Sequence, residues 1–364
     1  HRDLHSFPTR RSSDLNTLYW EPLNYEGFKK LSFNATDQKV AELFTILCSS
    51  LDKNMPFIAT HAWPAQAAIH AGLTNVINMI PDNWPMALHL AEGSVHTVQS
   101  PSAYLGYRIL REMQSPNGLS VPMPASDIKM VGHYIDHELV DNLENDTQAR
   151  MARINRKKAR RVLVSIGGAG AQFELNARLI RELAPLVKEN KAVLYINCGD
   201  HIAVWDKVTR LLETIGLMDS ATKHKDDWKE TTSFCGKALK NDVSGVHIFF
   251  NADKFAAVYT TNLLMRSTDL LLTKPSELAY YPVPKLLMQR IGGHERWGAV
   301  RAAELGDGTY ELENIECGAQ VLRLMLEEDD LLSLYNDQIV RNLKAGIYSG
   351  CYRIVDMALD KKAK

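Results

Sequence analysis

A glycine-rich turn is the feature of this sequence whose chemistry is easiest to state. The turn consists of Gly167, Gly168, Ala169, Gly170, Ala171 and Gln172. It follows an apolar run, 161–166, and precedes a helical pattern that begins at Phe173. Glycine permits positive φ, and a helix N-terminus presents unpaired N–H groups and a positive dipole end to an anion. This order predicts a phosphate site; a tight turn that only packs the helix on the sheet is the alternative.

The turn is not a dinucleotide fingerprint. It lacks the complete G-x-G-x-x-G spacing, and the next predicted strand ends at Asn197, Cys198 and Gly199 instead of an acidic residue. A phosphate-bearing ligand other than a nicotinamide dinucleotide is therefore expected.

Polar residues also follow the predicted strand 269–273, where an open α/β sheet binds ligands. They are Thr273, Lys274, Ser276 and Glu277. We expect Thr273 to cap a short helix that begins at Pro275, with Glu277 in its first turn. Glu277 then either accepts hydrogen bonds from a ribose diol or only complements the helix dipole.

A third predicted strand, 285–289, is followed by His294 and Glu295. These side chains either bond sugar hydroxyls or serve as a helix cap and a first-turn acid. Three strand ends with ligand-type residues in one domain favour a binding site, and the combination favours a nucleotide-sugar.

The sequence after Arg161 alternates between strand and helix patterns that position these residues. Strands are predicted at 162–166, 192–197, 246–249, 269–273 and 285–289, and helices at 173–188, 203–215, 254–266 and 294–305. The alternation predicts a doubly wound α/β domain.

The first half has a weaker version of the same alternation. A helix is predicted at 39–51 from the spacing of Val40, Leu43, Phe44 and Leu47, with strands at 56–60, 75–80, 95–98 and 129–131. This pattern also predicts a parallel sheet covered by helices.

Five segments are expected along the chain. Residues 1–15 resemble translated sequencing-adapter sequence and are excluded as a non-native artefact. We predict an incomplete domain over 16–146, a linker over 147–160, a second domain over 161–329 and closing helices over 330–364.

Composition excludes several classes of protein. With 42 basic and 43 acidic residues there is no global charge that favours nucleic acid, and the basic cluster in 156–161 is either a local anion patch or a solvated helix end. Five scattered cysteines without a C-x-x-C pair argue against a disulfide framework or a zinc site and predict a reducing, cytoplasmic setting. No apolar run is long enough to span a membrane, which leaves peripheral membrane contact open.

The second half resembles the nucleotide-sugar domain of glycosyltransferase family 28, over roughly 162–326. The resemblance rests on the glycine turn with Leu175-Asn176 after it, on Phe249-Phe250-Asn251, on Thr273-Lys274, and on Glu277 seven residues before Pro284. It implies that Gly167, Gly168, Ala169, Gly170, Phe250, Thr273, Lys274, Ser276, Glu277, His294 and Glu295 bind the donor. One departure is that only Pro275 and Ser276 separate Thr273-Lys274 from Glu277, where the family has several more small residues.

The family resemblance implies a GT-B-like fold of two Rossmann-like domains with parallel sheets facing a cleft, the first domain being truncated. The first half would bind the acceptor. There, Thr60-His61-Ala62-Trp63-Pro64 is similar to a His-Pro strand end, Ile80-Pro81-Asp82-Asn83 to a Thr-Asp strand end, and Gly132-His133 to an element before the family's linker.

The leading hypothesis is an inverting glycosyltransferase that uses a UDP-sugar or related donor, with no cofactor and no tightly bound metal. Asp82 or His61 would deprotonate an acceptor hydroxyl of a lipid or glycan. The other interpretations are a turn residue for Asp82 and a buried or capping residue for His61. A nucleotide-sugar epimerase or hydrolase, and a catalytically lapsed binding or scaffold protein, are the alternative functions.

Overall fold

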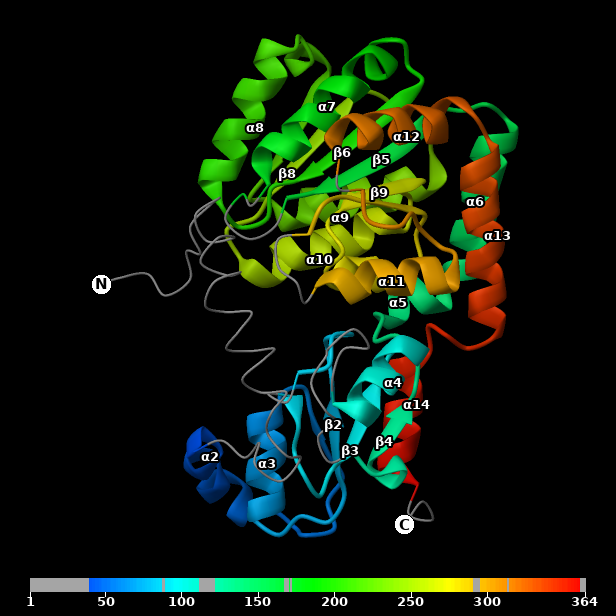
Figure 1. Ribbon diagram of the computed structural model, residues 1–364. Helices are drawn as coiled ribbons and strands as arrows, with labels where there is room; N and C mark the ends of the chain where they lie inside the picture. Colours follow the sequence, from blue (N-terminus) through cyan, green and yellow to red (C-terminus); the bar gives the residue numbers. More distant parts are fainter. Residues whose placement is uncertain are drawn as a thin grey trace. The chain divides into compact units, whose positions relative to one another are not determined.

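The computed structural model describes residues 39–86, 89–110, 122–166, 170, 172–290, 295–312 and 314–360 (Figure 1). The chain divides into two compact units. In the described part, unit 1 contains 136–290 and 302–344, whereas unit 2 contains 39–135, 295–301 and 345–360. The segment 147–160, predicted as a linker, is mostly helix α6 (Leu143–Asn155) and is grouped with unit 1.

Unit 1 is built on a six-stranded parallel sheet in the order β10-β9-β5-β6-β8-β7. In chain order the strands are β5 (Arg160–Ser165), β6 (Ala192–Asn197), β7 (Ala221–Lys225), β8 (Val246–Phe250), β9 (Leu270–Thr273) and β10 (Lys285–Leu287). Helices α7 (Phe173–Lys188), α8 (Ile202–Thr214) and α12 (Ile315–Glu327) lie on one face of the sheet, and α9 (Trp228–Lys240) and α10 (Lys254–Met265) lie on the other (Figure 1). The predicted doubly wound domain is confirmed.

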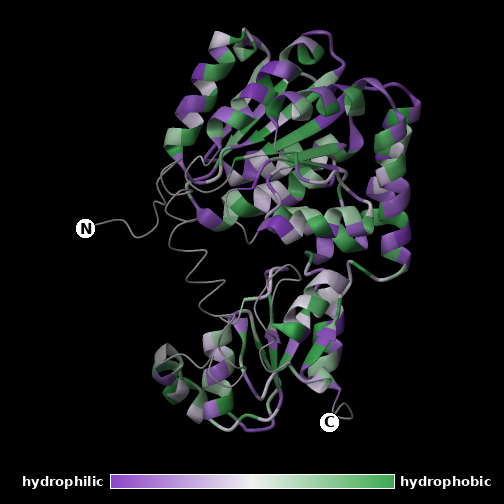
Figure 2. Ribbon diagram, viewed as in Figure 1, coloured by the Kyte–Doolittle hydropathy of each residue, from purple (hydrophilic) through white to green (hydrophobic). Residues whose placement is uncertain are grey.

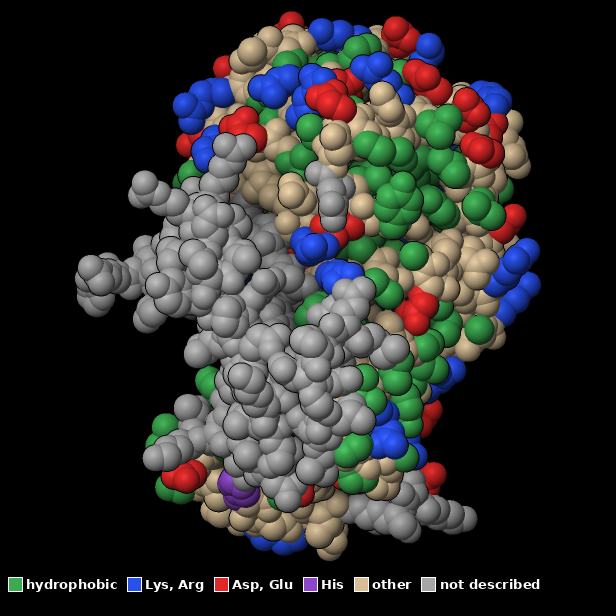
Figure 3. All heavy atoms as spheres, viewed as in Figure 1, with side chains coloured by type: hydrophobic (Ala, Val, Ile, Leu, Met, Phe, Trp, Pro, Cys, Tyr) green, Lys and Arg blue, Asp and Glu red, His purple; other side chains and the backbone are tan. Residues whose placement is uncertain are grey.

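The central strands of unit 1 are mostly apolar, as Figure 2 shows. Every residue of β6 and β8 is buried, because helices cover both faces of the sheet. The edge strand β7 differs, since Thr222, Lys223 and Lys225 are exposed and only His224 is buried. On the face shown in Figure 3, acidic and basic side chains are interspersed over the outer surface of unit 1.

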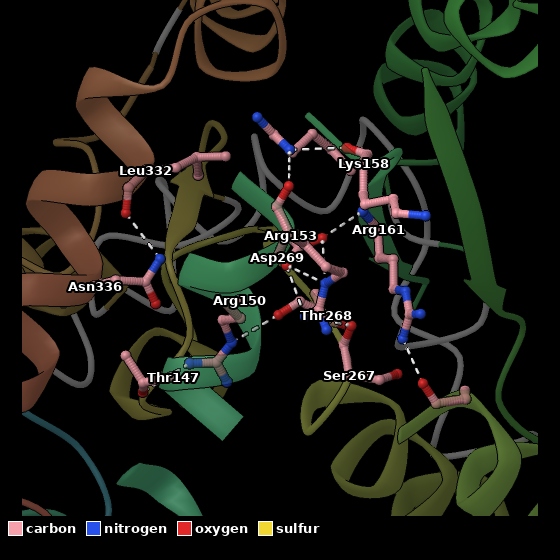
Figure 4. Close-up of polar contacts among 12 residues, drawn as sticks. Thr147, Arg150, Arg153, Lys158, Arg161, Ser267, Thr268, Asp269, Leu332 and Asn336 are labelled. Carbon is pink, nitrogen blue, oxygen red and sulfur yellow. Dashed lines mark hydrogen bonds and ion pairs between the residues drawn. The ribbon is translucent and has the colours of Figure 1, made fainter. Parts of the chain in front are cut away.

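Buried charges meet at the amino ends of β5 and β9 (Figure 4). Asp269 is completely buried; it pairs with Arg153 at 2.8 Å and accepts the backbone N–H of Arg161. The guanidinium of Arg150, also buried, donates to the carbonyl oxygen of Thr268. Through Arg150 and Arg153, α6 is joined to the sheet, and α13 (Asp330–Lys344) packs against α6. This charge cluster lies at the end of the sheet opposite to the glycine turn.

A pair of histidines is buried beneath α9. His224 Nδ1 lies 2.6 Å from Glu230 Oε2, and its Nε2 lies 3.1 Å from Nδ1 of His247. Burial, followed by the charge of His224, lowers the pKa of His247 from 6.5 to about 4. His247 is therefore neutral at physiological pH.

Unit 2 contains a four-stranded parallel sheet in the order β1-β2-β3-β4. Its elements are α2 (Lys39–Ser49), β1 (Phe57–Ala59), α3 (Ala62–His70), β2 (Val76–Met79), β3 (Val95–Val98), α4 (Pro101–Ile109), β4 (Ile128–Met130) and α14 (Gly350–Leu359). Helix α11 (Arg296–Leu305) begins in unit 2 and ends in unit 1, and the short helix α5 (His137–Asp141) belongs to unit 1. The parallel sheet expected from the first half is confirmed.

The packed face of α2 is not the one that its apolar spacing predicts. Leu43 and Leu47 are 74% and 68% exposed, whereas Ala41 and Cys48 are buried against the alanines of α3. Small side chains allow the two helices to approach closely, and this contact outweighs the larger apolar residues.

The connection from β2 to β3 contains no α-helix in its described residues, 80–86 and 89–94. A buried segment without helical hydrogen bonds leaves backbone groups that side chains must satisfy. Asn78 donates to the carbonyl oxygen of His89 at 2.7 Å, and Gln66 donates to that of Leu90 at 2.8 Å. The N–H of Ala91 donates to Nε2 of His96 at 2.9 Å. Three buried side chains therefore bond to backbone groups of three consecutive residues, 89–91.

Candidate functional site

The glycine turn and the residues after β9 follow adjacent strands. β5 pairs with β6 on one side and with β9 on the other, so the chain crosses from one half of the sheet to the other between β8 and β9. The carboxyl ends of β5 and β9 thus mark the topological switch point of unit 1. Ligands of open α/β sheets bind at such points.

Within the glycine turn, Gly170 and Gln172 are described, whereas Gly167, Gly168 and Ala169 lie outside the described residues. Gly170 has φ +82°, a conformation that favours glycine, and an added Cβ would meet Val204 Cγ2 at 3.1 Å. Gln172 is the N-cap residue of α7 at φ +58°, and its side chain makes no capping bond. That side chain donates instead to the carbonyl oxygen of Gln289, just after β10. The Gln172 side chain therefore does not compete with an anion for the backbone N–H groups of the first turn of α7.

The segment after β9 is tighter than the sequence predicts. A four-residue 3-10 helix, Glu277–Tyr280, replaces the helix expected from Pro275. Thr273 does not cap it, because the Thr273 hydroxyl donates to the carbonyl oxygen of Lys274 at 3.1 Å. With only Pro275 and Ser276 between Lys274 and Glu277, the chain has too few residues for an additional helical turn. Lys274 is half-buried, and Glu277, which follows the carboxyl end of β9, is exposed.

The remaining predicted donor residues are distributed differently. Phe250 ends β8 with its ring in the core against Trp205, at 6.2 Å between ring centroids. Glu295 is buried and belongs to unit 2, not to the unit that contains Glu277. Ser276 is half-buried at the N-cap position of the 3-10 helix. His294 lies outside the described residues.

In unit 2, His61 and Asp82 follow the adjacent strands β1 and β2. Exposed His61 is the N-cap of α3, and its Nδ1 accepts the backbone N–H of Trp63 at 3.2 Å. Because Nδ1 accepts, the neutral ring carries its proton on Nε2. Partial desolvation of the ring, followed by the coulombic effect of His89, lowers the pKa of His61. The ring is thus a capping group that also presents an N–H donor.

The turn that carries Asp82 is held from both sides. Gln99, just after β3, donates to the carbonyl oxygen of Pro81 at 2.8 Å. Ser100 donates to the side chain of Asn83 at 2.6 Å, and Tyr107 donates to the carbonyl oxygen of Trp84 at 2.8 Å. The carboxylate of Asp82 is 37% exposed. A partly exposed acid on a fixed turn suits acid–base chemistry.

His89 is a neighbour of Asp82 that the sequence does not reveal. Its Nε2 lies 2.9 Å from Asp82 Oδ2, a close polar contact that lacks the alignment of a hydrogen bond. The ring is almost fully buried, and its backbone belongs to the segment held by Asn78, Gln66 and His96. His89 lies in an irregular connection without periodicity, so the only available signal was a histidine seven residues after the aspartate.

His96 also has a defined tautomer. Burial lowers its pKa from 6.5 to about 4, so the ring is neutral at physiological pH. Since Nε2 accepts from Ala91, Nδ1 carries the proton and donates to the carbonyl oxygen of Asp127 at 3.0 Å.

Metal-binding groups, membrane-spanning helices and cysteines can be surveyed over the described residues. The described residues contain no group of three or more histidine, cysteine, aspartate or glutamate side chains placed to hold a metal ion. Over the same ranges, every helix is too short or too polar to cross a bilayer. All five cysteines are free in the structure.

Residues 123–359 match the family described as "Domain of unknown function (DUF6938)", and residues 2–109 match "Domain of unknown function (DUF6937)". The first match covers more than half of the chain. The chain belongs to the DUF6938 family. Neither description names glycosyltransferase family 28, so that resemblance stays a prediction. Among curated proteins, none matches in sequence.

Solved structures have the same fold at low sequence identity. The UDP-GlcNAc 2-epimerase from Neisseria meningitidis bound to UDP-GlcNAc is 12% identical with a TM-score of 0.52, covering 91% of this chain and 82% of that chain. The putative UDP-N-acetylglucosamine 2-epimerase from Listeria monocytogenes is 13% identical with a TM-score of 0.52, covering 90% and 79%. The chain therefore has a GT-B-like α/β fold with two parallel sheets.

Proposed function

We propose that the protein is an inverting glycosyltransferase that transfers a sugar from a nucleotide-diphosphate sugar, such as a UDP-sugar, to an acceptor hydroxyl. The observation that carries the proposal is the position of the glycine turn and of Lys274–Glu277 at adjacent strand ends on the switch point of unit 1. In this proposal the first turn of α7 and Lys274 stabilise the departing diphosphate, and Glu277 accepts hydrogen bonds from the ribose. Asp82 and His61 are the candidate acid–base residues of this proposal.

A nucleotide-sugar epimerase or hydrolase is the second candidate. It is supported by the two epimerases that have this fold, one of them bound to UDP-GlcNAc. Such an enzyme acts on the nucleotide-sugar without an acceptor, whereas a transferase requires one. Both candidates need the same nucleotide site.

Calorimetric titration of the full chain with UDP and with UMP tests the nucleotide site. We expect UDP to bind more tightly than UMP, because the second phosphate adds charge at the α7 N-terminus. Glu277→Ala is expected to weaken UDP binding roughly ten- to a hundredfold, since it removes a charged acceptor. The matched control is Glu213→Ala, which removes an exposed carboxylate from the far end of α8. The absence of binding of UDP and of the other nucleoside diphosphates by the wild-type protein would contradict both candidates.

Incubation with UDP-GlcNAc, followed by chromatography of the products, separates the candidates. Epimerised sugar or stoichiometric free UDP without an acceptor identifies the epimerase or hydrolase. Free UDP that appears only when a lipid or glycan hydroxyl is added identifies the transferase.

A further inference from the structure

The contacts of His61 indicate that its role differs from that of Asp82. A general base needs an accessible lone pair. Nδ1 of His61 already accepts the N–H of Trp63, which places the ring proton of the neutral form on Nε2. The accessible ring nitrogen is thus a donor, and burial together with His89 lowers the pKa of His61, which favours the neutral form.

The irregular β2–β3 connection places His89 against Asp82. His89, seven residues after Asp82, lies with its Nε2 2.9 Å from the Asp82 carboxylate. The backbone of His89 is fixed by Asn78, and the next two residues by Gln66 and His96. On the other side, Gln99 fixes Pro81. Both members of the contact therefore have fixed backbones.

We infer that Asp82 is the base of this site, that His61 is a neutral donor through Nε2–H, and that His89 is a positioning residue that fixes the Asp82 carboxylate. The inference rests on the proposed function, and it assigns separate roles to the two residues that the sequence left as equivalent candidates. His89 acts through Asp82 and does not touch substrate.

In the transfer reaction the acceptor hydroxyl gives its proton to the carboxylate of Asp82. The acceptor oxygen forms its bond to the anomeric carbon as the bond from that carbon to the diphosphate oxygen breaks. The electron pair leaves with the diphosphate. His61 donates a hydrogen bond from Nε2 to a substrate oxygen and keeps its proton throughout, so no further proton donor is required.

Nitrogen NMR of the wild-type protein tests the His61 assignment without any nucleotide-sugar. The ¹⁵N shifts of the imidazole rings distinguish the two tautomers. We expect His61 to be neutral at pH 7 with its proton on Nε2. A proton on Nδ1, or a charged His61 ring at pH 7, would overturn the assignment.

The variant His89→Gln tests the coupling. It is expected to raise the pKa of His61 in an NMR titration, because the coulombic effect of His89, which lowers that pKa, is removed. His70→Gln is the matched control, since His70 is an exposed histidine at the other end of α3. An unchanged His61 pKa in His89→Gln would refute the coupling. If His89→Gln does not fold, the pKa of His61 is measured in Asn78→Ala instead. Loss of the Asn78 bond is expected to displace His89 and so to raise the pKa of His61. An unchanged pKa of His61 in that variant also refutes the coupling.

Kinetics then separate positioning from catalysis. Asp82→Asn is expected to lower kcat about a hundredfold or more, and His89→Gln is expected to lower kcat less while moving the acidic limb of the pH–rate profile. His61→Asn keeps an N-cap acceptor for Trp63 and removes the ring N–H, so the expected loss is in kcat with stability unchanged. Equal losses in Asp82→Asn and His89→Gln with an unshifted profile would overturn the positioning role. Absence of all turnover would refute the proposed function and leave the NMR results standing.

Discussion

The two units satisfy their buried polar groups in different places. In unit 1 helices connect most of the strands, and the buried charges gather around Asp269 at the amino ends of β5 and β9. In unit 2 the described residues of the β2–β3 connection are irregular, and buried Gln66, Asn78 and His96 bond to their backbone next to the candidate acid–base residues. A helical connection satisfies its own backbone, whereas an irregular one recruits side chains and so fixes the residues that it carries.

The largest expected effect concerns the charges of unit 1. Asp269→Ala leaves the half-buried Arg153 without its carboxylate partner and removes the acceptor of the Arg161 N–H. Loss of one member of a buried pair costs about 3–5 kcal/mol. Chemical denaturation followed by far-UV circular dichroism measures the loss. A change below about 1 kcal/mol would show that this cluster does not anchor α6 to the sheet.

Acidification is expected to weaken both units. His96 in unit 2 and His247 in unit 1 both have pKa values lowered from 6.5 to about 4. The unfolded chain therefore binds more protons below pH 6.5, and stability falls as the pH is lowered from 6.5 towards 4, by on the order of 2 kcal/mol per histidine at pH 5. Hydrogen exchange at pH 7 and pH 5, corrected for intrinsic rates, reads each unit separately. Loss of protection in one unit alone would contradict the expectation that acid destabilises both units.

A single support of the irregular connection should matter less. Asn78→Ala leaves the carbonyl oxygen of His89 without its side-chain donor, at a cost of about 1–3 kcal/mol. The control is Asn142→Ala, which removes a comparable bond from a half-buried amide to the carbonyl oxygen of Glu138 in unit 1. Equal effects of the two variants in thermal denaturation would mean that the connection has no special need for side chains.

The smallest expected effect concerns an exposed ion pair of unit 1. Lys158 and Asp242 lie 2.8 Å apart with exposed side chains. The Lys158 side chain lowers the pKa of Asp242, yet solvent screening limits the value of such pairs. Lys158→Ala is expected to change stability by less than about 1 kcal/mol. A larger loss in urea denaturation would mean that charge at this end of unit 1 matters even outside the core.

Regular elements with strong apolar patterns were predictable from the sequence. The bounds of α7 and β6 agree with the predicted 173–188 and 192–197, because both elements direct apolar side chains into one core. β7 was missed because its only buried side chain is His224, so neither apolar alternation nor an apolar run marks it.

The candidate site was predictable in part. The family resemblance singled out Asp82 and His61 as candidates, and the two residues do follow adjacent strands. The contact of His89 with Asp82 was not predictable, because it depends on the path of an irregular connection. The 3-10 helix at Glu277 was mispredicted because capping rules assume an α-helix, for which the short segment has no room.

One feature of unit 1 bears on how the protein behaves in concentrated solution. β7 is an edge strand, and the edge of a sheet is a template for pairing with another chain. Its exposed Lys223 and Lys225 put like charges on that edge, so two copies that approach edge to edge repel each other. The same polar residues that concealed β7 in the sequence therefore protect the protein against edge-to-edge aggregation.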